Sequence, residues 1–160
     1  MPSKPQKPPA TGRAKADRLR AEPDREPRTQ YAALPWRPDA SGFIEILLIT
    51  SRETRRWVIP KGWPIKALRP GQSAAQEAFE EAGVFGLVRN RRIGRYHYDK
   101  RLRSGRLQHV RVLVYPLEVR EMASEWPEIG QRAHRWVTPA QAAEMVDEPE
   151  LKALLAAFRG

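Results

Sequence analysis

Cysteine is absent from this chain of 160 residues, and histidine occurs only three times. The absence of cysteine excludes disulfide bonds and thiol nucleophiles, and so few histidines argue against a zinc site. No apolar run approaches the ~18 residues that a transmembrane helix requires. No apolar segment follows the charged N-terminus in the manner of a signal peptide. We therefore expect a cytoplasmic protein that has no membrane anchor.

Large apolar side chains are also scarce at the start of the chain. Residues 1–28 contain six prolines and many charges, but only Met1 and Leu19 among the larger apolar residues. Such a segment cannot bury enough surface to offset the entropy lost on ordering. We expect residues 1–28 to be a disordered, basic, proline-rich tail, and residues 29–160 to form a single domain.

The charge of the chain is strongly positive. Its formal net charge is +10, of which the tail contributes +4, so that +6 remains for residues 29–160. A basic domain attracts polyanions such as nucleic acid, an acidic membrane surface or a densely phosphorylated small molecule.

Apolar runs separated by turn residues predict a sheet with helices on both sides. Strands are expected at residues 31–36, 43–49, 57–59, 107–119 and 133–137, with a further strand inside residues 85–98 that forms a hairpin with 107–119. Helices are expected up to residue 82, from Pro139 to about residue 146 with Thr138 as N-cap, and from Pro149 onward. This order of elements predicts an α/β fold with a mixed central sheet.

The start of the first helix has two interpretations. Ser73 and Gln76 fit a capping box, with Ser73 as the N-cap. Alternatively, Pro70 occupies the first helical position, where its missing N–H costs nothing.

Three glutamates gather at the end of that first helix. Glu77, Glu80 and Glu81 stand at i, i+3 and i+4, so they project from one face within a turn. No Lys or Arg occurs among residues 70–88, and the helix dipole disfavours negative charge at this end. Positive charge must therefore come from outside the segment. A hard cation such as Mg²⁺ fits these oxygen ligands, whereas the alternative is an ordinary solvated helix end.

Residues 62–84 resemble a Nudix box, the signature of the Nudix hydrolase superfamily. The matching positions are Gly62, Glu77, Ala78, Glu80, Glu81, Gly83 and Val84, with the spacing of the box preserved. Two positions depart from it: Leu68 replaces the first glutamate, which usually assists the metal site, and Gln76 replaces an arginine that usually orients the helix carboxylates.

Two further stretches are similar to bacterial relatives of the diphosphoinositol polyphosphate phosphohydrolase branch. They are residues 49–64 and the segment with Glu125, Trp126, Pro127 and Glu128, followed by Arg132, Arg135 and Trp136. The resemblance covers about residues 29–158 and implies an αβα sandwich. It also implies hydrolysis of a pyrophosphate bond with Mg²⁺ or Mn²⁺, the ligands being Gly62, Glu77, Glu80 and Glu81.

The phosphates of such a substrate require cationic partners. Candidates near the box are Arg52, Arg55, Arg56, Lys61 and Lys66, because Arg offers bidentate contacts to phosphate oxygens and Lys a compact positive charge. Each of the three arginines also fits a solubilising loop. Glu77, Glu125 and Glu128 are candidates for the catalytic base.

Two other functions compete with a pyrophosphohydrolase acting on a polyphosphorylated small molecule. The first is a catalytically impaired sensor, because Leu68 and Gln76 remove two functional side chains of the box. The second is an RNA partner held through its backbone, although no aromatic RNA-binding signature is present. The chain is expected to be a monomer or a homodimer.

Overall fold

The computed structural model describes residues 26–160, so the predicted tail lies almost entirely outside the described part of the chain. The first strand, β1 (Arg28–Pro38), is longer than expected from the sequence. It is followed by β2 (Ile44–Thr50), β3 (Trp57–Val58) and β4 (Lys61–Gly62), then by helix α2 (Pro70–Ala82). The rest of the chain forms β5 (Val84–Val88), β6 (Gly94–Arg101), β7 (Leu107–Met122), β8 (His134–Val137), α3 (Pro139–Met145) and α4 (Pro149–Ala157).

The strands form one mixed sheet with the order β3-β2-β1-β7-β5. Strand β1 runs parallel to β7, with Arg28 opposite Val110 and Trp36 opposite Glu118. The other pairs are antiparallel: β4 pairs with β1, β6 with β7, and β8 with β2. The sequence predicts one strand inside residues 85–98, whereas the structure has two strands in this region, β5 and β6. The hairpin between β6 and β7 is confirmed.

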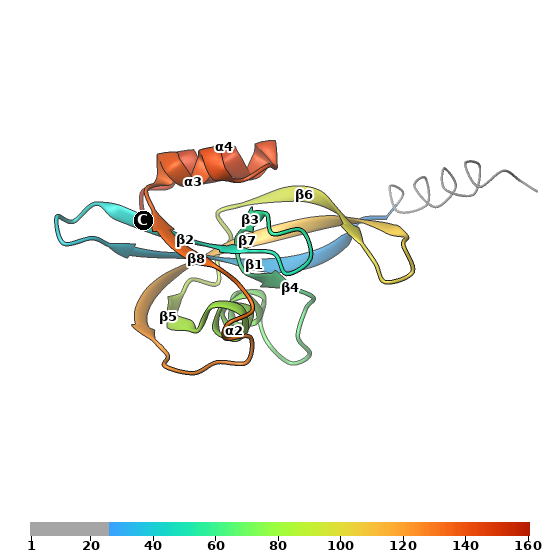
Figure 1. Cartoon of the computed structure of the whole chain (residues 1–160), viewed down its shortest axis with the longest axis horizontal. Helices are drawn as coiled ribbons and strands as arrows, with labels where there is room; N and C mark the ends of the chain where they lie inside the picture. Colours follow the sequence, from blue (N-terminus) through green and yellow to red (C-terminus); the bar gives the residue numbers. More distant parts are fainter. Residues whose placement is uncertain (1–25) are drawn as a thin grey trace, which may run out of the picture.

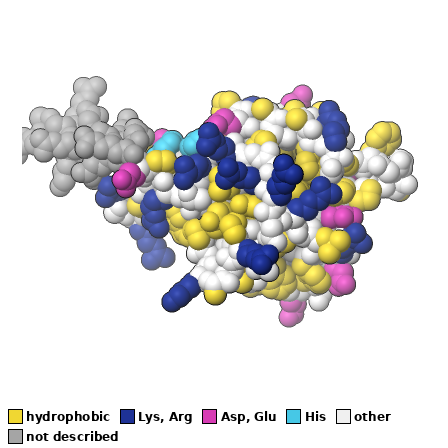
Figure 2. Space-filling model, turned by 180° about the vertical axis from the view of Figure 1, so that it is seen from behind, with side chains coloured by type: hydrophobic (Ala, Val, Ile, Leu, Met, Phe, Trp, Pro, Cys, Tyr) yellow, Lys and Arg dark blue, Asp and Glu magenta, His cyan; other side chains and the backbone are white. Residues whose placement is uncertain are grey.

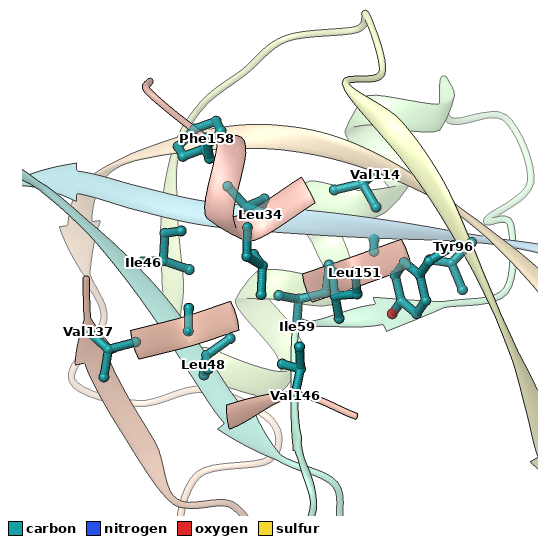
Figure 3. Packing of buried hydrophobic residues seen from close by; sticks show 14 of the residues in the cluster. Leu34, Ile46, Leu48, Ile59, Tyr96, Val114, Val137, Val146, Leu151 and Phe158 are labelled. Carbon is teal, nitrogen blue, oxygen red and sulfur yellow. The ribbon is translucent and has the colours of Figure 1, made fainter. Parts of the chain in front are cut away.

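Helices cover both faces of the sheet, which confirms the αβα sandwich. Helices α3 and α4 lie on one face, and α2 lies on the other, near strand β5 at the end of the strand order (Figure 1). Alternating side chains of each central strand supply both cores. Leu34, Ile46 and Leu48 join Leu151 and Phe158 on the α3/α4 side (Figure 3).

The second core lies under α2. Ala33, Leu47 and Ile49 pack there against Ala74 and Ala78 of the helix. Because the central strands are buried on both faces, they appear in the sequence as nearly continuous apolar runs rather than as alternating patterns.

Helix α2 begins with Pro70 at its first position, so the second of the two predicted starts is confirmed. The Gln72 side-chain oxygen accepts a hydrogen bond from the Arg69 N–H at 3.2 Å. The capping box at Ser73 and Gln76 is wrong, because Ser73 is already inside the helix and its hydroxyl accepts from the Ile65 N–H at 3.1 Å. Gly83 ends the helix with a φ of +68°, and its N–H bonds the Phe79 carbonyl.

The two C-terminal helices follow their predicted signals. The Thr138 hydroxyl caps α3 by accepting a hydrogen bond from the Gln141 N–H at 3.1 Å. The side-chain oxygen of Gln141 in turn accepts one from the Thr138 N–H at 3.0 Å. Leu151 and Leu155 of α4 are fully buried against the sheet.

Candidate functional site

Gly62 and Glu77 meet where strand β4 passes the middle of helix α2. Strand β4 is anchored because Gly62 pairs with Tyr31 of β1. A Cβ at position 62 would overlap the carboxyl group of Glu77. Only glycine therefore allows this carboxyl group to lie against the β4 backbone.

Glu81 is the most buried of the three predicted glutamate ligands, with 11% of its side chain exposed. One carboxylate oxygen lies 3.4 Å from the Lys61 backbone N–H, and the other lies 3.5 Å from Nη2 of Arg132. Burial raises the pKa of Glu81 to about 7 although Arg132 and Lys61 favour its charged form. The positive charge expected from outside the helix is thus supplied by Arg132 and Lys61.

Glu77 is also difficult to ionise. Its pKa is raised to about 7, mainly by burial and then by the negative charges of Glu81, Glu80 and Glu128. Glu80 is half-buried, and its backbone carbonyl accepts a hydrogen bond from the Glu128 N–H at 3.0 Å. That bond attaches the segment before β8 to the end of α2.

Within residues 26–160, no three His, Cys, Asp or Glu side chains are gathered closely enough to enclose a metal ion by themselves. Mg²⁺ commonly binds through one or two carboxylates and completes its coordination with water and substrate phosphates. The donors present are all oxygens. Burial, together with nearby carboxylates, raises the pKa of Glu77 and of Glu81 to about 7, and a cation would favour the charged form of both groups. The residues therefore fit a hard divalent cation.

A cleft of about 640 Å³ opens beside these carboxylates. It lies among the β2–β3 loop, strand β4, the β6–β7 hairpin and the segment before α4. Its lining includes six cationic side chains, Arg52, Arg56, Lys61, Lys100, Arg101 and Arg132, and five acidic ones, Glu53, Glu81, Asp99, Asp147 and Glu148. Of the predicted metal ligands, Glu81 lines this cleft, so its carboxyl group and the cationic side chains share one cavity.

Three of the predicted phosphate-binding residues, Arg52, Arg56 and Lys61, line this cleft. Arg52 pairs with Glu128 at 3.0 Å, and Arg56 pairs with Glu148 at 3.1 Å. Burial lowers the pKa of Lys61 to about 8, even though Glu81 and Glu148 favour its charged form.

Two predicted phosphate-binding residues are not brought to the cleft lining. Arg55 is exposed in the β2–β3 turn with a φ of +57°, and Lys66 is exposed in the loop before α2. Arg132, Lys100 and Arg101 line the cleft although the sequence did not single them out as substrate-binding residues. The glutamates of α2, which have no cation nearby in the sequence, indicate that a positive charge comes from elsewhere in the chain. They do not indicate that Arg132 supplies it.

The two histidines of the β6–β7 hairpin, His97 and His109, pack against each other, and His97 also lines the cleft. The rings of His97 and His109 stack with centroids 5.4 Å apart. Each ring nitrogen Nδ1 has a carboxylate partner, Glu150 for His97 and Asp99 for His109. The two rings are thus held by their own stacking and by these two carboxylates.

The two tryptophans nearest the Nudix-like segment have structural contacts. Trp126 covers Gly83 at the end of α2, and Arg28 stacks over Trp63. Among the candidate bases, Glu128 is mostly buried beside Arg52 and Arg132, whereas Glu125 is exposed.

Comparison with proteins of known sequence identifies similar chains. The chain is 28% identical over 117 residues to Nudix hydrolase 16, mitochondrial, from Arabidopsis thaliana, covering 71% of this chain and 64% of that protein. It is 34% identical over 106 residues to diphosphoinositol polyphosphate phosphohydrolase 3-beta from Bos taurus, covering 64% of this chain and 60% of that protein. The chain thus spans less than two thirds of either relative. No family model matches.

Solved structures share the fold. A C. elegans Ap4A hydrolase superposes with a TM-score of 0.56 at 20% identity, covering 82% of this chain and 95% of that one. A NUDIX hydrolase from Nitrosomonas europaea gives a TM-score of 0.61 at 15% identity, covering 82% and 87%. Among residues 26–160, no helix is both long and apolar enough to cross a membrane.

Proposed function

We propose that this chain, a homologue of Nudix hydrolases that has the Nudix fold, hydrolyses a pyrophosphate bond in a polyphosphorylated small molecule with the help of Mg²⁺ or Mn²⁺. The observation that carries the proposal is that Glu81 of α2 opens into a cleft that is also lined by six cationic side chains. This reaction requires both carboxylates that hold a metal ion and cationic side chains that hold the phosphates.

The metal would be held by Glu77, Glu80, Glu81 and the carbonyl of Gly62. When bound, a divalent cation supplies Lewis-acid polarisation of a phosphoryl oxygen and makes water easier to deprotonate. The chain itself contributes charge and orientation. Arg52, Arg56 and Lys61 neutralise the phosphates of the substrate, and the proton of the attacking water passes to a carboxylate.

Two carboxylates are candidates for accepting that proton. Glu128 is held beside the α2 carboxylates by its backbone bond to Glu80 and by Arg132. Glu77 has a pKa of about 7, close to the value that suits a base at neutral pH. Glu128→Gln and Glu77→Gln, compared by the pH dependence of kcat, would separate them.

The composition of the cleft favours a densely phosphorylated substrate over a nucleotide. Six cationic side chains line it, whereas the aromatic faces in its lining are those of His97 and Tyr98. The ring of His97 is stacked on His109, and the ring of Tyr98 lies under Lys61 at 5.0 Å. One face of each ring is thus already covered, which leaves little aromatic surface for a base and makes a diphosphoinositol polyphosphate the preferred candidate. A dinucleoside polyphosphate is the second.

The test is a substrate panel with Mg²⁺ or Mn²⁺. It comprises diphosphoinositol phosphates, dinucleoside polyphosphates, ADP-ribose, nucleotide sugars and 5'-triphosphorylated RNA. We expect turnover of the most highly phosphorylated compounds and its loss in Glu80→Gln and Glu81→Gln. Equal product release by the wild type and Glu81→Gln from every compound would refute the enzyme assignment.

A catalytically impaired sensor is the second candidate function. It is favoured by Leu68 and Gln76 in place of the box acid and arginine, and by the lack of a closed three-acid cluster in the described residues. A sensor would show a ligand-induced rise in Tm without product release. Location in the cytoplasm and a monomeric or homodimeric state remain predictions.

A further inference from the structure

We propose that Arg132 positions the carboxylates of the metal site, in place of the arginine that the Nudix-like segment lacks at position 76. The proposal rests on the proposed metal-dependent function, because it assigns a role toward the same carboxylates. Arg132 contacts one of those carboxylates, that of Glu81, from outside the helix that carries it.

The guanidinium group of Arg132 contacts three separate segments. Its Nη2 lies 3.2 Å from Oε1 of Glu128 and 3.5 Å from Oε1 of Glu81. Its Nη1 donates a hydrogen bond to the carbonyl of Thr50 at 3.1 Å, at the end of β2. One rigid, planar group therefore joins the end of α2, the segment before β8 and the central sheet.

The surroundings of Arg132 hold it in place. Only 8% of its side chain is exposed. Its neighbour at position 133 is fixed as well, because the N–H of Ala133 donates to the Thr50 hydroxyl at 2.9 Å. Arg52 also reaches Glu128, but 58% of its side chain is exposed, so Arg52 can move toward a substrate while Arg132 cannot.

The Nε of Arg132 is buried without a hydrogen-bond partner among the described residues. An arginine placed only to stabilise the fold would be expected to have all of its buried donors satisfied. Here both Nη groups have oxygen partners, whereas Nε has none among the described residues. This arrangement is consistent with a side chain whose position serves Glu81 and Glu128.

No residue of α2 can take this role. The helix carries no Lys or Arg, and Gln76 is exposed on its surface. Leu68, at the position of the first box acid, is 39% exposed. The acid and the arginine that the segment lacks are thus both replaced by uncharged residues, and the cation beside Glu81 comes from a position 51 residues downstream along the chain.

The test measures Mn²⁺ affinity, by electron paramagnetic resonance of the free ion, in the wild type, Arg132→Gln and Arg132→Lys. Lysine keeps the charge, but its single ammonium cannot contact Thr50 and both carboxylates together. Removing a group that orients metal ligands typically weakens metal binding by about 10–100-fold, and we expect a loss in this range for both variants. Arg135→Gln is the matched control, because Arg135 is exposed on β8; its Mn²⁺ affinity should equal that of the wild type.

Circular dichroism in the absence of metal establishes which variants are folded. If Arg132→Gln does not fold, Arg132→Lys decides the question, because a purely structural cation would be replaced by lysine without loss of Mn²⁺ affinity. A folded Arg132→Lys protein with the Mn²⁺ affinity of the wild type would overturn this inference and leave the proposed function unaffected. If the wild type bound no Mn²⁺, the proposed metal-dependent function would fall as well.

Discussion

At the scale of single residues, the site depends on close approach between a backbone and a carboxyl group. Gly62 is the residue that permits it, since any side chain at this position would occupy the space of the Glu77 carboxyl. Sequence spacing identifies both residues, because they belong to one recognisable motif. Their contact could be predicted from the resemblance but not from the residue types alone.

We predict that Gly62→Ala lowers kcat by about tenfold or more, because displaced catalytic groups commonly cost ~10²-fold in rate. The control is Gly105→Ala in the β6–β7 turn. Gly105 has a φ of +81° with open space around it, so its replacement should reduce stability but not kcat. Steady-state kinetics and Tm on both variants make the comparison; equal kcat values for the two would refute the role of Gly62.

The raised pKa values of Glu77 and Glu81 predict how stability depends on pH. An acid whose pKa is higher in the folded state binds more protons when folded, so stability decreases as pH rises between the unfolded and folded pKa values. In chelator-treated protein, Tm should therefore fall from about pH 4.5 to about pH 7, the window between the ordinary carboxyl pKa and the pKa of about 7 for both groups. Thermal unfolding across this range is the measurement.

Glu81→Gln is the control for that titration. It removes one of the two groups, so its decrease in Tm over the same range should be smaller than that of the wild type. Mg²⁺ should also reduce the decrease, because a cation favours the charged carboxylates. Identical slopes for Glu81→Gln and the wild type without metal would contradict the assignment.

At the scale of elements, helix α2 is defined by its two ends. Pro70 starts it, and Gly83 stops it in a left-handed conformation beneath the ring of Trp126. The sequence contained both signals, and the choice between two starts depended on tertiary structure: Ser73 is used by the preceding loop instead of serving as a cap.

We predict that Gly83→Ala destabilises the protein by more than Gly130→Ala. Both glycines have positive φ, +68° and +79°, which costs an alanine of the order of 1–2 kcal/mol. At position 83 alone, the added Cβ would also overlap the Trp126 ring, whereas position 130 is open. Urea unfolding of the two variants gives the difference; an equal loss would show that the Trp126 contact does not constrain the helix end.

Most strands could be predicted because continuous apolar runs mark central strands. The short strand β4 could not, because Lys61 and Gly62 have no strand pattern of their own and pair with β1 through tertiary context. The sequence predicts a single strand in the region of β5 and β6. Residues 89–93, which connect the two strands, are mostly basic, and the clear strand breaker, Gly94, comes only after them.

At the scale of the whole molecule, cationic side chains from separate segments line one cleft. Figure 2 shows Lys and Arg side chains spread across one face of the molecule, between apolar and uncharged areas. The basic composition predicted an anionic partner, but it could not show that Lys100 and Arg101 of the hairpin would join Arg52 and Arg56 in one cavity. That juxtaposition depends on the sheet topology.

We predict that KM for a polyphosphorylated substrate rises with salt concentration, because screening weakens the attraction between the cleft and its ligand. Lys100→Ala and Arg101→Ala should raise KM at low salt and reduce its dependence on salt. Arg103→Ala, which removes an exposed cation from the turn of the same hairpin outside the cleft lining, should leave both unchanged. Equal salt dependence in all three variants would indicate that only the overall charge matters.

The parallel pairing of β1 with β7 has a consequence for synthesis of the protein. Arg28 pairs with Val110 and Trp36 with Glu118, so the first described strand finds this neighbour only after some eighty intervening residues have left the ribosome. Contacts between such distant segments form slowly, and until β7 is made the edge of β1 that pairs with it has no partner. The interval between translation of β1 and that of β7 is thus a period in which an unpaired strand edge of the newborn domain is open to association with other chains.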